Sequence, residues 1–275
     1  MYRRALALIF ALSLAIGASG CNGESATLHG VVEGVVTDQV TGRPIEDVWV
    51  MSGSIVAWTN ASGVYWLSLP QGAQSIRYQR AGYARGDLCV TVPGRAAAKT
   101  DLMLNPILPV GPVQMSLTWQ ASPKDLDAHL WTLEGYHVNH SCGGSLTSPP
   151  WAKLDYDYFD GHGKETIVIA EFAHDTYRYS VHNYSGTPAI AGSGAQVDVY
   201  SQSQLLYTLT APHSGPVGCL VWDVFEIEGA TRKVARLDTL RDCPGWTLEQ
   251  NGAADKPDAR GATGFRQIDE LPAGH

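Results

Sequence analysis

Two short segments in the second half of the chain concentrate acidic side chains. Asp125 and Asp127 open the first segment, and the second, residues 155–165, is rich in Asp and Gly. Ca²⁺ takes about six to eight oxygen ligands from carboxylates and turn carbonyls, and Gly161 and Gly163 would let the backbone curl toward a cation. These segments predict a Ca²⁺ site; the alternative is a turn whose carboxylates accept hydrogen bonds from backbone N–H groups. The candidate ligands are Asp125, Asp127, Asp155, Asp157, Asp160 and Glu165.

Histidines form a second group with metal-binding chemistry. His137 and His140 lie three residues apart, with Cys142 close behind, and three such ligands could hold Zn²⁺. On a strand, however, residues i and i+3 point to opposite faces. We therefore expect solvated or hydrogen-bonded histidines here, and ordinary packing for His129 and His182 in their predicted strands.

Aromatic residues suggest a third kind of site. Tryptophans are spread along the chain, and we expect most of them in the core. Trp151, which follows two prolines, and the pair Tyr156 and Tyr158 are the set that we expect to be exposed. Exposed rings of this kind could stack on sugars, so a glycan is an alternative ligand.

Signatures of catalysis are missing from the sequence. It has no Gly-x-Ser-x-Gly elbow, no HExxH helix, no phosphate loop and no dinucleotide fingerprint. His162 and Glu165 form an HxxE string, but it lies in a Gly-rich turn. We expect no enzyme activity; the alternative is a small hydrolase with an unfamiliar site.

The N-terminus predicts export. Arg3 and Arg4 precede the apolar run 5–18, and small residues follow up to Cys21, which is the pattern of a secretory signal. The run is shorter than the roughly 20 residues of a membrane-spanning helix. Small residues before Cys resemble the lipobox of bacterial lipoproteins, which implies lipidation of Cys21 and anchoring in the cell envelope, on its periplasmic or surface face. An ordinary signal peptidase site, and hence a secreted protein, is the alternative.

Cysteine number is consistent with lipidation. The chain has five cysteines, which is an odd number for an exported protein. If Cys21 carries lipid, four remain for two disulfides, and three connectivities are open. Reactive thiols or metal ligands are the alternative. The disulfide candidates are Cys89, Cys142, Cys219 and Cys243.

Charge excludes some partners. The 275 residues include 19 Lys and Arg and 27 Asp and Glu, giving a net charge of -8. Nucleic acids and anionic membrane surfaces require clustered cations, so we expect neither. Membrane attachment would come from the lipid alone.

Short alternating segments, separated by turn residues, predict an all-β protein with two β-sandwich domains. About eight strands in the second domain favour a Greek-key or jelly-roll sandwich. The predicted organisation is a signal peptide (1–21), a linker (22–28), a sandwich (29–106), a semi-rigid Pro/Gly linker (107–112), a second sandwich (113–232) and a largely disordered tail (233–275).

The first sandwich contains a series of motifs in order. Together they resemble the carboxypeptidase regulatory-like domain, which has a transthyretin-like, Ig-type fold. The resemblance implies an accessory module, such as a spacer or a carbohydrate-binding-like fold, and no peptidase activity. The motifs are Gly34–Asp38, Thr41–Ile45, Val48–Val50, Thr59–Tyr65 and Ala81–Tyr83.

The second sandwich resembles the β domain of YfaP-like proteins, an uncharacterised bacterial family. In that family's pattern, Asp is common at the position of Tyr158 and Pro at that of Lys164, so the departures imply weaker Ca²⁺ binding. The matching segments are Leu117–Trp119, Asp125–Leu130, Gly144–Leu146, Leu154–Glu165, Tyr179–Gly186, Ser193–Val197 and Trp222–Phe225.

These features predict a non-catalytic lipoprotein of the bacterial cell envelope that binds, adheres to or presents a ligand. Ca²⁺ is the one cofactor that the residues suggest. The alternatives are a carbohydrate-binding envelope protein and a structural or assembly component that contacts other envelope proteins.

Overall fold

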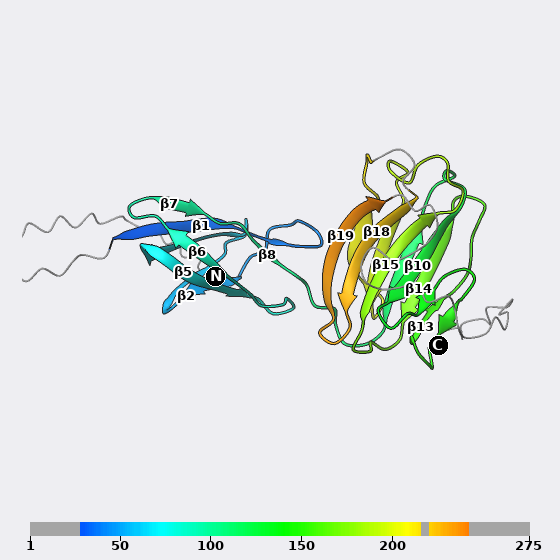
Figure 1. Ribbon diagram of the computed structural model, residues 1–275, viewed down its shortest axis with the longest axis horizontal. Coiled ribbons are helices and arrows are strands. Elements are labelled where there is room, and N and C mark those ends of the chain that lie inside the picture. The colour runs from blue at the N-terminus through cyan, green and yellow to red at the C-terminus, as the bar shows by residue number, and fades with distance from the viewer. Residues whose placement is uncertain (1–27, 216–219, 242–275) are drawn as a thin grey trace, which may run out of the picture.

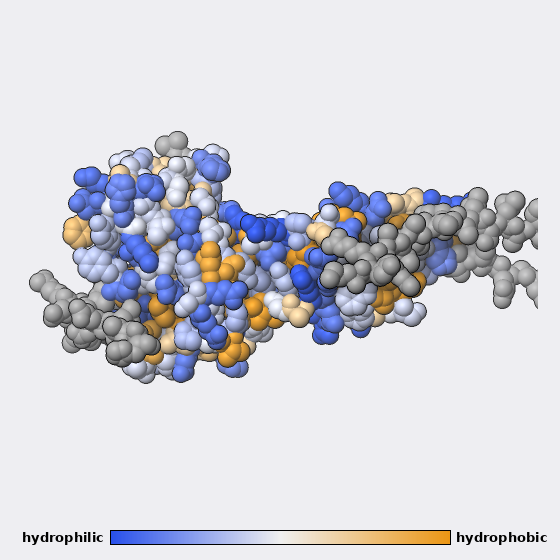
Figure 2. Space-filling model, turned by 180° about the vertical axis from the view of Figure 1, so that it is seen from behind, coloured by the Kyte–Doolittle hydropathy of each residue, from blue (hydrophilic) through white to orange (hydrophobic). Residues whose placement is uncertain are grey.

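The computed structural model describes residues 28–215 and 220–241. Every regular element in these ranges is a β-strand, and the strands form two bodies that follow one another along the long axis (Figure 1). The all-β prediction is therefore confirmed. No helix in the described part of the chain is long and apolar enough to cross a membrane. On the face that Figure 2 shows, apolar residues form small patches among hydrophilic ones.

The N-terminal sandwich packs two four-stranded sheets. One has the order β4-β1-β7, with β8 also paired to β1, and the other has the order β3-β2-β5-β6. The core side chains alternate along the strands; Tyr65, for example, points inward and donates its hydroxyl proton to the Thr100 carbonyl (2.7 Å). The strands are β1 (His29–Asp38), β2 (Trp49–Ser52), β3 (Ile55–Trp58), β4 (Val64–Pro70), β5 (Gly72–Gln79), β6 (Gly86–Val92), β7 (Ala97–Lys99) and β8 (Leu102–Leu104).

The C-terminal sandwich has a five-stranded sheet, β11-β10-β15-β18-β19, and a six-stranded sheet, β12-β13-β14-β9-β16-β17. Apolar residues between the sheets form one core. The strands are β9 (Val113–Thr118), β10 (Leu126–Thr132), β11 (His137–Val138), β12 (Gly144–Ser145), β13 (Ala152–Leu154), β14 (Lys164–Ile169), β15 (Thr176–Asn183), β16 (Gln196–Ser201), β17 (Gln204–Thr210), β18 (Val221–Glu228) and β19 (Lys233–Arg241).

Strand β10 positions the candidate site. Leu126, Ala128 and Leu130 belong to the core, so the alternate residues Asp127 and His129 project from the other face of the sheet. This second row is nevertheless buried. A buried polar row on the outer face of a sheet is unusual and requires partners.

Strand β19 corrects the predicted boundary at residue 232. It pairs with β18 from Lys233 to Arg241, inside the segment predicted to be a largely disordered tail. The strand lacks clear apolar alternation and is half-buried along most of its length. It also bonds β18 through polar side chains, since the Arg241 guanidinium donates to the Asp223 carboxylate (2.6 Å). Residues 242–275 lie outside the described part.

Candidate metal centre

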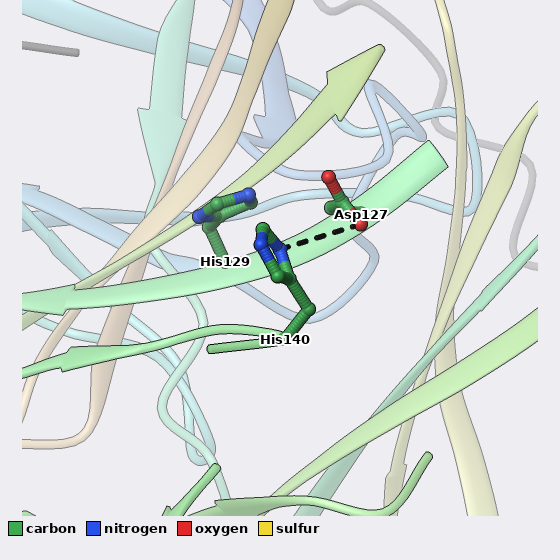
Figure 3. A group of neighbouring side chains, drawn as sticks. All are labelled: Asp127, His129 and His140. Carbon is green, nitrogen blue, oxygen red and sulfur yellow. Dashed lines mark ion pairs between the residues drawn. The ribbon is translucent and has the colours of Figure 1, made fainter. Parts of the chain in front are cut away.

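Three side chains on the outer face of the five-stranded sheet lie close enough together to share a metal ion. One ligand atom each of Asp127, His129 and His140 lies within 4.8 Å of the others. Asp127 and His129 come from β10, and His140 reaches over from the segment after β11 (Figure 3). The Nδ1 atom of His140 lies 3.6 Å from a carboxylate oxygen of Asp127.

A tight turn brings His140 to this group. Strand β11 ends at Val138, and Asn139 then forms a bridge with Cys142. The Asn139 side-chain oxygen accepts hydrogen bonds from the backbone N–H groups of Ser141 (2.7 Å) and Cys142 (2.9 Å). The chain therefore folds back, with His140 in the turn.

The prediction that His137 and His140 point to opposite faces is thus wrong. It assumed a continuous strand, whereas β11 has only two residues. Both rings lie close to His129, with centroids 5.0 Å away for His137 and 6.3 Å away for His140.

His137 fixes the orientation of His129. The His137 Nε2 atom lies 2.7 Å from the His129 Nδ1 atom, and the His137 ring stacks on Trp131 at a centroid distance of 3.3 Å. Burial, followed by the neighbouring His137, holds the pKa of His129 well below its ordinary value. Burial, followed by His140, lowers the pKa of His137 to about 3. Both imidazoles are neutral at pH 7, which is the form that binds metals.

His182 adds a fourth imidazole. It faces Asp127 across the β10–β15 register, and its Nδ1 atom lies 3.4 Å from the other carboxylate oxygen of Asp127. The exposed ring of Tyr184 packs edge-on against both His140 and His182, with centroids 5.9 and 6.1 Å away. Ordinary packing was predicted for His129 and His182. His129 lies beside Asp127 on the same strand, whereas His182 reaches Asp127 only through the pairing of β10 with β15.

Part of the predicted acidic site converges at the same place. Asp125, Asp127 and Asp157 have carboxylate oxygens within 4.8 Å of one another, so Asp127 belongs to both groups. Burial and then the charges of Asp127 and Asp157 raise the pKa of Asp125 to about 6. Burial and then Asp127 raise the pKa of Asp157. Among the described residues, the Oδ1 atom of Asp125 has no hydrogen-bond partner. A cation here would relieve this repulsion.

The other three predicted ligands lie elsewhere. Asp155 accepts hydrogen bonds from the backbone N–H groups of Tyr156 and Thr166, as the alternative turn interpretation predicts. Asp160 is exposed and belongs to neither group.

Glu165 has a structural role in this loop. It is fully buried, and it accepts hydrogen bonds from the backbone N–H groups of Ala128 (2.7 Å) and Tyr158 (3.1 Å). Burial raises its pKa to about 9. Glu165 therefore ties the Asp157 loop to β10 without joining the three-carboxylate group.

Two of the three predicted surface aromatics are exposed. Tyr156 is 57% exposed and Tyr158 is 38% exposed, with ring centroids 6.3 Å apart, whereas Trp151 is half-buried. The most exposed tryptophans of the described chain are Trp58 and Trp66, at the edges of the N-terminal sandwich. The sequence did not predict the exposure of these two tryptophans, because apolar and polar residues alternate in edge strands as they do in central ones.

The cysteine predictions stay predictions. Cys89 and Cys142 are both exposed, and Cys89 forms no disulfide with another cysteine of the described ranges. Cys21, Cys219 and Cys243 lie outside those ranges.

The donor set indicates which metal fits. Imidazole nitrogens with one carboxylate suit Zn²⁺, Cu²⁺ or Ni²⁺, whereas Ca²⁺ prefers oxygen ligands alone. Three protein ligands would leave one position of a tetrahedral zinc site for water or another ligand.

No protein-family model and no curated protein match this chain. Among solved structures, a DUF3823 family protein from Bacteroides ovatus aligns over 67% of this chain and 99% of its own, with 11% identity and a TM-score of 0.23. A candidate carbohydrate-binding protein from Bacteroides uniformis aligns over 66% of this chain and 96% of its own, with 12% identity and a TM-score of 0.24.

A cohesin–X-dockerin complex from Acetivibrio cellulolyticus gives a shorter alignment. It covers 28% of this chain and 58% of that chain, with 12% identity and a TM-score of 0.25. This chain therefore spans little more than half of that structure. At these TM-scores the likenesses carry no inference about function, and the two family resemblances remain resemblances between motifs.

Proposed function

We propose that this protein is an exported, non-catalytic module of the bacterial envelope that binds a divalent metal ion of the zinc class. The ligands are Asp127, His129 and His140. The observation that carries the proposal is the convergence of their ligand atoms within 4.8 Å on a buried face of β10.

Burial favours metal binding over simple packing. Asp127 is 2% exposed and His129 is 3% exposed, so both are already desolvated before a ligand arrives. His129 is neutral and needs no deprotonation, and its second ring nitrogen is held by His137. Such an outer hydrogen bond orients a metal-binding imidazole and fixes its tautomer.

Ca²⁺ is a second candidate at the same place. It would use Asp125, Asp127 and Asp157, whose carboxylates lie within 4.8 Å of one another. The raised pKa values of Asp125 and Asp157 favour it, since burial and then the neighbouring carboxylates disfavour their charged forms, and a cation would favour those forms. Asp127 belongs to both sets of ligands, so its substitution cannot distinguish Zn²⁺ from Ca²⁺. Substitutions of His140 and Asp157, which belong to one set each, can.

Titration calorimetry of the metal-free full-length chain with Zn²⁺ and with Ca²⁺ tests both candidates. We expect Zn²⁺ to bind, and His140→Ala to weaken Zn²⁺ binding tenfold or more while Asp157→Asn does not. If Ca²⁺ is the ligand, Asp157→Asn weakens its binding and His140→Ala does not. His174→Ala, an exposed histidine outside the group, is the control. A Zn²⁺ affinity that is unchanged in His140→Ala contradicts the zinc proposal.

The envelope part of the proposal rests on the N-terminal sequence. Lipidation of Cys21 would anchor the two sandwiches at a membrane. Cells fed labelled palmitate should label the wild type and not Cys21→Ala, and the variant should move from the membrane to the soluble fraction. Equal labelling of both proteins contradicts the lipid anchor.

A further inference from the structure

A depression lies on the outer face of the six-stranded sheet. The candidate metal centre lies on the other sheet of the same sandwich, the five-stranded one. The depression has a volume of about 430 Å³, which lies in the range of roughly 300–1,000 Å³ for small-molecule sites. Its lining includes Pro112, Gln114, Val168, Tyr200, Gln202 and Ser203.

The floor of this depression is one row of side chains across three adjacent strands. Gln114 of β9 pairs in register with Val168 of β14 on one side and Tyr200 of β16 on the other. Their chain neighbours Met115 and Val199 belong to the core, so the row faces outward. Tyr200 therefore presents a half-buried ring beside an amide.

Hydrogen bonds hold this face in place. The Gln114 side-chain amide donates to the Ser116 hydroxyl (3.1 Å), and the Tyr200 hydroxyl donates to the Asp198 carboxylate (3.5 Å). At the wall, the Gln202 side-chain amide donates to the Val110 carbonyl (3.2 Å). An amide has two N–H donors and one acceptor oxygen, so Gln114 and Gln202 retain hydrogen-bonding capacity for a ligand.

The chemistry of the lining selects an uncharged ligand. Amides, a hydroxyl, a tyrosine ring and apolar groups line the depression, and none of the described lining residues carries a formal charge at pH 7. Outside the lining, Lys153 pairs with Val168 at the next position of the same row, and the Asp198 carboxylate accepts the Tyr200 hydroxyl proton, so the nearest charged side chains have opposite signs. The lining itself therefore offers a charged partner to neither an anionic nor a cationic ligand.

An extended peptide fits less well than a saccharide. Peptides bind sheets by adding a strand to an exposed edge, but β9 lies between β14 and β16, and its backbone is already paired on both sides. A saccharide instead offers hydroxyl groups to amides and an apolar ring face to an aromatic side chain. We propose that this depression binds a neutral saccharide, with Tyr200 as the stacking platform and Gln114 and Gln202 as hydrogen-bonding groups.

Titration of the full-length chain with neutral hexasaccharides of glucose, mannose, xylose and N-acetylglucosamine, followed by tryptophan fluorescence and calorimetry, tests the proposal. At least one should bind, Tyr200→Ala should weaken it tenfold or more, and Tyr200→Phe should retain most of the affinity because the ring remains. Gln202→Ala, in an exposed turn, is a second variant that should weaken binding without disturbing the sheet. Tyr184→Ala, at the metal centre, is the matched control.

The saccharide site and the proposed metal site can fail separately. Zn²⁺ affinity should be the same in Tyr200→Ala as in the wild type, and saccharide affinity should be the same with Zn²⁺ or with a chelator. No binding of any of the four hexasaccharides overturns the proposal. Binding that survives both Tyr200→Ala and Gln202→Ala, or that is lost in Tyr184→Ala, overturns it as well.

Discussion

His137 sets the geometry of the proposed metal centre at the scale of single residues. It contacts His129 through a short hydrogen bond and stacks on Trp131. It is not one of the three grouped ligands, so its effect on a metal would act through His129. Loss of such an outer partner typically lowers metal affinity by about 10–100-fold.

We expect His137→Ala to lower Zn²⁺ affinity by this factor, because the His129 ring loses the group that fixes its tautomer. His137→Gln should restore part of the affinity, since its amide oxygen can accept the His129 N–H. Calorimetric titration measures both. If the two variants bind Zn²⁺ as tightly as the wild type, His137 has no positioning role.

The lowered pKa of His137 also predicts that the stability of the fold depends on pH. The His137 imidazole titrates near 6.5 when unfolded and near 3 when folded. Between these values the unfolded chain binds the extra proton, so the stabilisation is present at pH 7 and is lost as the pH falls. From pH 7 to pH 5 the loss from this group is about 2 kcal/mol at most.

In metal-free protein, His137→Gln should therefore lose less unfolding free energy than the wild type between pH 7 and pH 5. Urea unfolding at both pH values measures the difference. Equal losses in the two proteins would show that His137 is not held neutral by the fold.

At the scale of elements, the acidic loop is fixed by the close approach of Gly163 to Trp119. A Cβ atom at Gly163 would lie 2.0 Å from a ring carbon of Trp119, which is almost fully buried. Only glycine allows the loop to return to β14 at this point, which brings Asp157 toward β10.

Gly163→Ala should destabilise the protein by about 1–3 kcal/mol, because an added methyl group overpacks a rigid contact. Thermal unfolding measures the change. At Gly186 an added Cβ would meet no atom within 4 Å, so Gly186→Ala carries only the cost of its positive φ and should be milder. A Gly163→Ala variant as stable as the wild type would show that Trp119 can move aside.

The two sandwiches share contacts at the scale of the whole molecule. Val40, from the turn after β1, is fully buried in the core of the C-terminal sandwich. Gln39 exchanges two hydrogen bonds with the Arg236 backbone, at 3.0 and 2.7 Å. Arg232 reaches the carbonyl oxygens of Pro109 and Gly111 in the linker. The linker and the turn after β1 therefore both connect the two sandwiches.

Val40→Asp should separate the two sandwiches and destabilise both, because it places a charge in an apolar core. Calorimetry should show one transition for the wild type and two for the variant. Thr41→Asp adds the same charge at an exposed neighbouring position and should leave the single transition intact. Identical melting of the two variants would contradict a shared core.

Local pattern was sufficient for much of this fold. Alternation along β1 and β10 and the turns between strands identified an all-β chain, because strand formation and turn chemistry depend on neighbouring residues. The sequence also placed Asp125 and Asp127 in one acidic segment, and their carboxylates do lie close together. Turn chemistry also anticipated the role of Asp155, whose carboxylate caps backbone N–H groups.

Tertiary structure alone decided which side chains meet. His182 reaches Asp127 through the β10–β15 register, and His140 reaches it because β11 stops after two residues and turns. Strand β19 exists because β18 supplies its hydrogen bonds, although its own sequence lacks apolar alternation. The sequence by itself determined the strand-forming segments and the available chemical groups. Pairing between distant strands and the path of the turns decided their convergence, since neither is encoded in a local period.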